Sequence, residues 1–224
     1  MDTHHFFWFC LVMSSLKKFL FDFVAPRLRV SPASLYERQR ELVRGGLLPV
    51  RQGRGPGSGV PLTPDTLAIF LIGLLATDGL TDLVEHTSAL CSAKTLLVHK
   101  PTKETRYGNT FQSDLAKALA GSDEFTGKDA SDSSAHPCAG VQVTRHWRGA
   151  LLQNLGVPDG DGDAAEGWKA VEYIVSDESR RKAPVLAQTV SLEMEAFWLV
   201  STRLREELGL IETARTRYYY GDGA

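Results

Sequence analysis

Residues 34–65 read SLYERQRELVRGGLLPVRQGRGPGSGVPLTPD, and this stretch decides the fold that the sequence predicts. Ser34 and Glu37 have the capping-box spacing and Gly45 with Gly46 supplies a stop, so we expect a helix over residues 35–44. The loop over residues 50–61 holds four glycines and two prolines, which is typical of a flexible or hairpin loop. The predicted order is therefore a capped polar helix, a basic loop and the start of another helix.

Helical patterns continue on both sides of this stretch. Residues 16–24 carry apolar side chains at i, i+3, i+4 and i+7, the pattern of one helical face. After the loop, Thr63 is placed to cap a helix that runs through residues 67–76 and is apolar nearly all round, as in a buried helix. Capping-box and amphipathic patterns predict further helices over residues 83–93 and 111–120.

The second half of the chain has a different pattern. Residues 121–137 are rich in Ser, Asp and Gly and predict a linker. Strand-like composition follows at residues 141–147, 168–175 and 185–192, and a closing helix is predicted over 193–208. The predicted fold class is α+β: an all-helical, winged-helix-like N-terminal domain and a small C-terminal antiparallel sheet with a packed helix.

This pattern divides the chain into five parts. We expect a helical domain over residues 13–120, the linker, an α+β domain over 138–212 and a tail over 213–224. Residues 1–12 are expected to be an upstream extension of the reading frame, with Met13 as the true start.

The whole composition is that of an ordinary globular protein. The 224 residues include 25 Lys and Arg, 27 Asp and Glu and three cysteines, of which no two lie close in sequence. Neither a disulfide framework nor a paired-cysteine metal site is therefore expected. The apolar run at residues 6–13 is too short to cross a bilayer, which needs roughly 20 residues. These features predict a cytoplasmic protein with no membrane partner.

The formal net charge of −2 hides one strongly basic segment. Residues 27–54 contain seven arginines and two glutamates, a local net charge of +5. The arginines are Arg27, Arg29, Arg38, Arg40, Arg44, Arg51 and Arg54. Arginine suits phosphate and guanine because its planar guanidinium forms bidentate contacts and stays charged.

This segment predicts a double-stranded DNA partner. The helix over 35–44 is expected to enter the major groove with Arg40 and Arg44 on one face, flanked by Arg38 and Gln39. The loop is expected to lie beside it and to add two further contacts. The predicted DNA-binding residues are Arg38, Gln39, Arg40, Arg44, Arg51 and Arg54. No cofactor, metal or catalytic residue is predicted.

The same run resembles a known domain. Tyr36-Glu37-Arg38 onward to Gly46-Leu47-Leu48-Pro49, the basic loop and the capped helix that follows are similar to the MerR-type winged-helix domain. The chain lacks that family's paired aromatics before Gly-Leu-Leu, its long dimerising coiled coil and its effector cysteines. Its plan also resembles small regulators from prophage and gene-transfer-agent regions. The resemblance implies a helix-turn-helix transcriptional regulator that binds a specific DNA sequence through the arginines.

Alternatives remain open at this level. The arginines could instead meet an acidic surface on RNA polymerase or a phage factor, in an adaptor without intrinsic DNA binding. Adjacent aromatics in the closing helix, Phe197 and Trp198, cannot both face the sheet, so the C-terminal domain could contact a protein. A small enzyme with a site in the C-terminal sheet is a third possibility, although no catalytic motif supports it.

Overall fold

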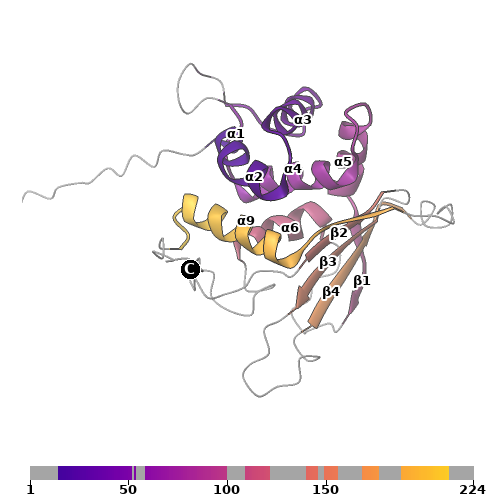
Figure 1. Ribbon diagram of the computed structural model, residues 1–224. Helices are drawn as coiled ribbons and strands as arrows, with labels where there is room; N and C mark the ends of the chain where they lie inside the picture. Colours follow the sequence, from indigo (N-terminus) through magenta and orange to yellow (C-terminus); the bar gives the residue numbers. More distant parts are fainter. Residues whose placement is uncertain are drawn as a thin grey trace, which may run out of the picture.

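The computed structural model describes residues 15–51, 53, 59–99, 109–121, 140–145, 149–155, 168–176 and 188–211. It confirms the α+β fold class, with most helices in the N-terminal part and a five-stranded antiparallel sheet in the C-terminal half (Figure 1). No helix within these residues is long and apolar enough to cross a membrane.

The first helical segment is continuous, but its helix type changes from α to π and back to α. It consists of α1 (Leu16–Phe19), a π-helical turn (Leu20–Val24) and α2 (Ala25–Leu28). Pro26 explains the π turn, because it lacks a backbone N–H and its ring would clash with the carbonyl four residues earlier in a regular helix. The predicted helix over 16–24 is therefore confirmed, and the structure extends it to residue 28.

The arginine-rich helix begins earlier than its sequence pattern predicts. It is α3 (Pro32–Arg44), and its N-cap is Ser31, whose hydroxyl accepts a hydrogen bond from the Ser34 backbone N–H. The expected cap at Ser34 is wrong, because Pro32 occupies a first-turn position, where its missing N–H costs nothing.

Helix α4 (Pro64–Ala76) is the centre of the helical part, and its predicted cap and burial are confirmed. Thr63 caps it through a reciprocal pair of hydrogen bonds with Thr66. Helix α5 (Leu83–Cys91) confirms the helix predicted over residues 83–93 but ends two residues earlier, and its N-cap residue Asp82 makes no side-chain capping hydrogen bond. Helix α6 (Phe111–Ala120) agrees with its predicted bounds.

The sheet has the strand order β1-β4-β3-β2-β5, and every neighbouring pair is antiparallel. Its strands are β1 (Lys94–His99), β2 (Gly140–Thr144), β3 (Gly149–Leu155), β4 (Trp168–Ile174) and β5 (Thr189–Leu192). Helix α9 (Met194–Glu207) closes the described chain, as predicted. Strands β1 and β3 are additions that the sequence pattern did not predict.

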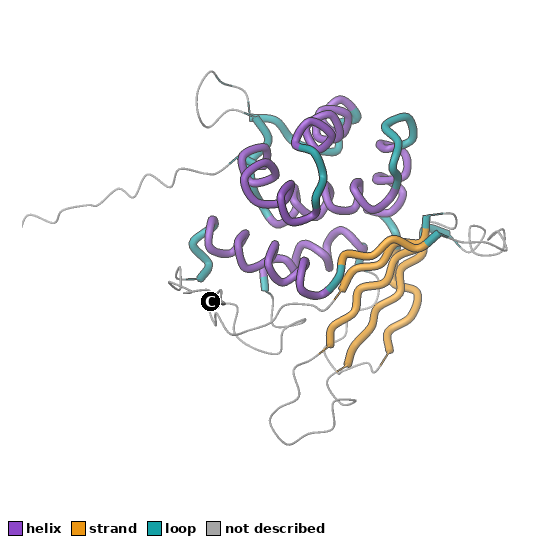
Figure 2. The backbone as a smooth tube through the Cα atoms, in the orientation of Figure 1, coloured by secondary structure: helices purple, strands orange, loops and turns teal. Residues whose placement is uncertain are grey.

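The two halves share one hydrophobic core, which runs from Leu16 in α1 to Leu204 in α9. Figure 2 shows the N-terminal helices on one side of α6 and α9 and the sheet extending away from them. Helix α4 packs against α5 and α6 and also meets β2 and β5. Strand β1 belongs to the first half of the sequence yet forms an edge of the sheet beside β4. The predicted linker lies outside the described residues apart from Gly121.

Candidate nucleic-acid interface

A short, sharp turn joins α2 and α3. Three residues, Arg29 to Ser31, separate the end of α2 from the start of α3. Arg29 has the left-handed φ of +53°, and the N–H groups of Arg29 and Val30 both bond the carbonyl of Ala25, which ends α2 sharply. A three- or four-residue turn of this kind joins the two helices of DNA-binding helix-turn-helix units. The first residues of α3 after the turn are exposed, and α3 as a whole lies at the edge of the molecule in Figure 1.

The inner face of α3 anchors it to the body of the protein. Leu35 and Leu42 are fully buried, and α3 packs against the π-helical turn, α4 and α5. The close fit at the C-terminal end depends on Gly45, where an added Cβ would lie 2.5 Å from a Cγ of Val84 in α5. The orientation of the outer face is therefore fixed by packing.

Arg38 lies on this inner face, which corrects its expected place in a DNA groove. Its side chain is 6% exposed, and its guanidinium donates to the carbonyls of Gly73 (3.4 Å), Thr77 (2.8 Å) and Asp78 (2.5 Å). These carbonyls lie at the C-terminal end of α4, where helical carbonyls lack intrahelical donors and a cation is favoured. Burial lowers the pKa of Arg38, although arginine stays protonated at working pH. Arg38 thus caps α4 and does not face solvent.

A second arginine holds the same helix end from the opposite side. Arg145, just after β2, donates from Nε to the Leu75 carbonyl at 3.0 Å. Its two Nη atoms bind the Asp78 carboxylate at 2.5 and 2.8 Å, and this pairing lowers the pKa of Asp78. The end of α4 is therefore held by α3 on one side and by the sheet on the other.

Gln39 is also buried, which corrects its expected groove-facing position. It is 8% exposed, and its Oε1 has no hydrogen-bond partner among the described residues. It lies beside the pocket described below instead of on the outermost row of the helix.

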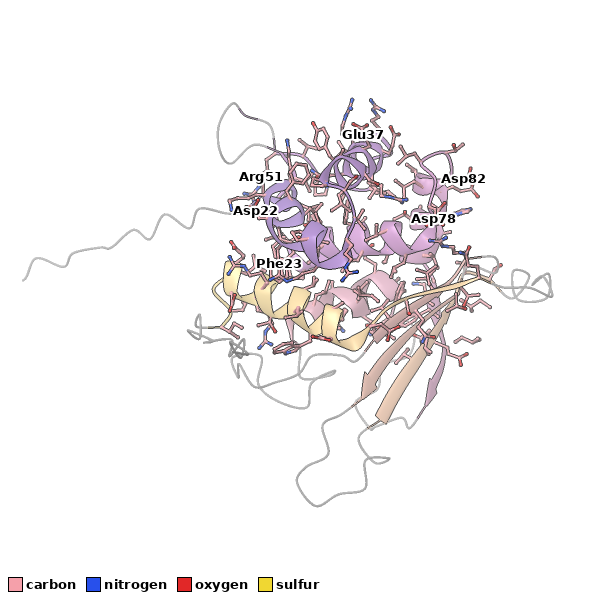
Figure 3. The ribbon with its side chains drawn as sticks, in the orientation of Figure 1. Asp22, Phe23, Glu37, Arg51, Asp78 and Asp82 are labelled. Atoms are coloured by element: carbon pink, nitrogen blue, oxygen red, sulfur yellow. The ribbon has the colours of Figure 1, made fainter. Side chains whose placement is uncertain are left out.

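The outer face of α3 carries the predicted pair Arg40 and Arg44. Both are exposed, and each is bonded to a glutamate three residues earlier, Glu37 and Glu41. Figure 3 shows Glu37 at the outer edge of α3. Exposed ion pairs contribute only about 0–1 kcal/mol, so a phosphate could displace the glutamates from the guanidinium groups at small cost.

Tyr36 completes this outer row at i, i+4 and i+8 with the two arginines. Its ring is 36% exposed and lies 4.5 Å from the Nζ of Lys17 and 5.8 Å from the Cζ of Arg40. Phe21 meets the ring edge-on at 6.3 Å. We did not predict Tyr36 or Lys17 as contacts from the sequence. Tyr36 follows Leu35, whose side chain faces inward, so the outward direction of Tyr36 could be predicted from the sequence. No local sequence feature indicates its contact with Lys17.

The basic loop is expected to be flexible or a hairpin, and its described ends pair as in the base of a hairpin. Arg51 and Gly59 exchange two backbone hydrogen bonds of 2.9 and 3.2 Å, and Gly59 has φ +104°. Arg51 is exposed. Arg54 lies outside the described residues.

A pocket of about 340 Å³ separates the hairpin base from α3. Its lining comes from three segments: the start of α1, the outer flank of α3 and the hairpin base. The lining residues are Ser15, Lys17, Tyr36, Gln39, Arg40, Val43, Arg44, Val50, Gly59 and Val60. The hairpin, α1 and α3 thus form one continuous surface.

Among the described residues, the structure offers neither a metal-binding cluster nor a reactive thiol. They contain no group of three His, Cys, Asp or Glu side chains that could hold a metal ion. Burial raises the pKa of the Cys91 thiol to about 12, so this cysteine is not a reactive nucleophile at neutral pH.

Comparison with known proteins identifies no relative: no family model matches the chain, and no curated protein or solved structure matches it.

Proposed function

We propose that this protein is a transcriptional regulator that binds a specific sequence of double-stranded DNA through the outer face of α3. Tyr36, Arg40 and Arg44 form the reading row, and Arg51 and Arg54 of the hairpin contact the adjoining backbone. Arg38 and Gln39 are left out of this set because they are buried.

The observation that supports this proposal best is the exposed α3 after a three-residue turn, with a basic hairpin beside it. A single helix is narrow enough to enter the major groove, which is about 12 Å wide. Packing of the inner face fixes which side chains would reach the bases, while the hairpin would reach the sugar–phosphate chain.

The test is a fluorescence-anisotropy titration against a random duplex library, followed by selection of bound sequences. Arg40→Ala with Arg44→Ala should weaken binding at least about tenfold at moderate salt and reduce the salt dependence, because phosphate contacts release counterions. Arg203→Ala is the matched control, since Arg203 is a similarly exposed arginine paired with glutamates, but on α9. Absence of binding to any duplex, or equal binding by the double variant, would overturn the proposal.

A second candidate is a protein-interaction adaptor that uses the same face. The alternation of Glu37, Arg40, Glu41 and Arg44 makes the outer face of α3 mixed in charge, which also suits a protein surface. Stoichiometric capture of RNA polymerase from nuclease-treated lysate, without intrinsic DNA affinity, would favour the adaptor.

A further inference from the structure

The pocket between α3 and the hairpin base combines an apolar lining with cationic side chains. Val43, Val50 and Val60 supply the apolar part, and Val50 is 49% exposed although it is a large aliphatic side chain. Lys17, Arg40 and Arg44 supply three cations, and no acidic side chain is among the described residues that line the pocket. A molecule that fits must therefore present an apolar surface next to an anion.

We propose that this pocket binds the sugar–phosphate backbone of one DNA strand, with Lys17 as its phosphate contact. This inference rests on the proposed function and adds to it a contact from α1, at the start of the helical segment that precedes α3. A deoxyribose offers carbon atoms to the valines, and the adjoining phosphodiester offers its negative charge to Lys17.

Lys17 is prepared for this role by aromatic rings. Its Nζ lies 4.5 Å from the centre of the Tyr36 ring and 5.4 Å from that of Phe21. It makes no ion pair with any residue that the structure describes. Cation–π contacts hold an ammonium group in place without neutralising its charge. The ammonium group is thus positioned at the pocket and still available to a phosphate.

Lys18, the next residue, has a different environment. Its Nζ binds the carboxylate of Asp22 at 2.7 Å on an exposed part of α1, and this pairing raises the pKa of Lys18. It is not among the lining residues. The two adjacent lysines therefore differ in position: the side chain of Lys17 lines the pocket, and that of Lys18 does not.

Gln39 is a polar but buried part of the pocket wall. Its side chain is more than nine-tenths buried in the pocket wall, and its Oε1 accepts no hydrogen bond from a described residue.

The test compares Lys17→Ala with Lys18→Ala on a duplex that the wild-type protein binds. Lys17→Ala should weaken binding about fivefold at moderate salt and lower the slope of log affinity against log salt by about 1. Lys18→Ala should change affinity less than about twofold, because its exposed pair contributes little. Circular dichroism and urea unfolding verify that both variants fold.

Single methylphosphonate linkages, which are uncharged, locate the phosphate. One position in the duplex should weaken wild-type binding but leave Lys17→Ala binding unchanged, as expected for two groups in one contact. Val50→Glu should mimic the loss of Lys17 by placing a negative charge in the pocket.

The outcomes separate this inference from the proposed function. Duplex binding that Lys17→Ala and Lys18→Ala affect equally would overturn the pocket contact and leave the proposed function standing. If no duplex binds and calorimetry shows Lys17-dependent binding of deoxyadenosine monophosphate, both statements about DNA are overturned and the pocket takes a free phosphorylated ligand.

Discussion

The two faces of α3 use the same residue type for opposite purposes. On the inner face, Arg38 is buried and bonds three carbonyls at the end of α4. On the outer face, Arg40 and Arg44 are exposed, and each pairs with a glutamate of its own helix. A positive charge count over residues 27–54 therefore mixes arginines that hold the fold with arginines that are available to a partner.

The largest expected effect comes from Arg38→Ala. This change leaves three carbonyls at the end of α4 without their donor and opens a cavity, so we expect the free energy of unfolding to fall by about 3 kcal/mol. Urea denaturation of the wild-type protein and the variant at pH 7 measures this loss of stability.

Arg40→Ala is the control on the other face, and it should change stability by less than about 0.5 kcal/mol. Equal losses in the free energy of unfolding for Arg38→Ala and Arg40→Ala would contradict the difference between the two faces.

The next effect tests how closely the inner face fits. In Gly45→Ala the new Cβ would overlap the Val84 side chain, and such overpacking costs about 2 kcal/mol. Gly46→Ala meets nothing within 4 Å but must adopt φ +72°, which costs about 1 kcal/mol.

A double variant separates the steric overlap at Gly45 from the backbone strain at Gly46. Val84→Ala should partly rescue Gly45→Ala and should not rescue Gly46→Ala, as unfolding free energies in a double-mutant cycle would show. A larger loss for Gly46→Ala than for Gly45→Ala contradicts the close approach of α3 to α5.

Much of this architecture could be predicted from local sequence. The Thr63 cap and the apolar pattern of α4 predicted a buried helix, because caps and periodicity are local properties. The inward direction of Arg38 was also readable, since Leu35, Arg38 and Leu42 stand at i, i+3 and i+7 on one helical face. A charge count overlooks this periodicity, and Arg38 was assigned to the wrong face for that reason.

The rest depends on contacts between distant segments. Strand β1 pairs with β4 more than 70 residues later, and its own sequence has no alternation that marks it as an edge strand. Asp78 and Arg145 are 67 residues apart, and the contact of Lys17 with Tyr36 requires the turn between α2 and α3. The pocket could not be predicted because its lining comes from three separate segments.

The smallest expected effect concerns Asp78, which connects the inner face of α3 to the sheet. Its backbone carbonyl is bonded by Arg38 and its carboxylate by Arg145, and the latter pairing lowers the carboxyl pKa below its ordinary value of 3.8. Because the folded-state pKa is the lower one, the pair stabilises the fold above about pH 4 and loses this contribution as pH falls through the folded-state pKa.

Asp78→Asn should therefore lower the free energy of unfolding by less than about 1 kcal/mol at pH 7, since the Asp78 side chain is 82% exposed and its pair is screened by solvent. Urea unfolding of both proteins between pH 7 and pH 3 should show the difference shrinking below about pH 4, and 1 M salt should reduce it at pH 7. A difference that stays constant across this range would mean that the carboxylate is not what couples the sheet to α4, and that Arg145 acts through its hydrogen bond to the Leu75 carbonyl.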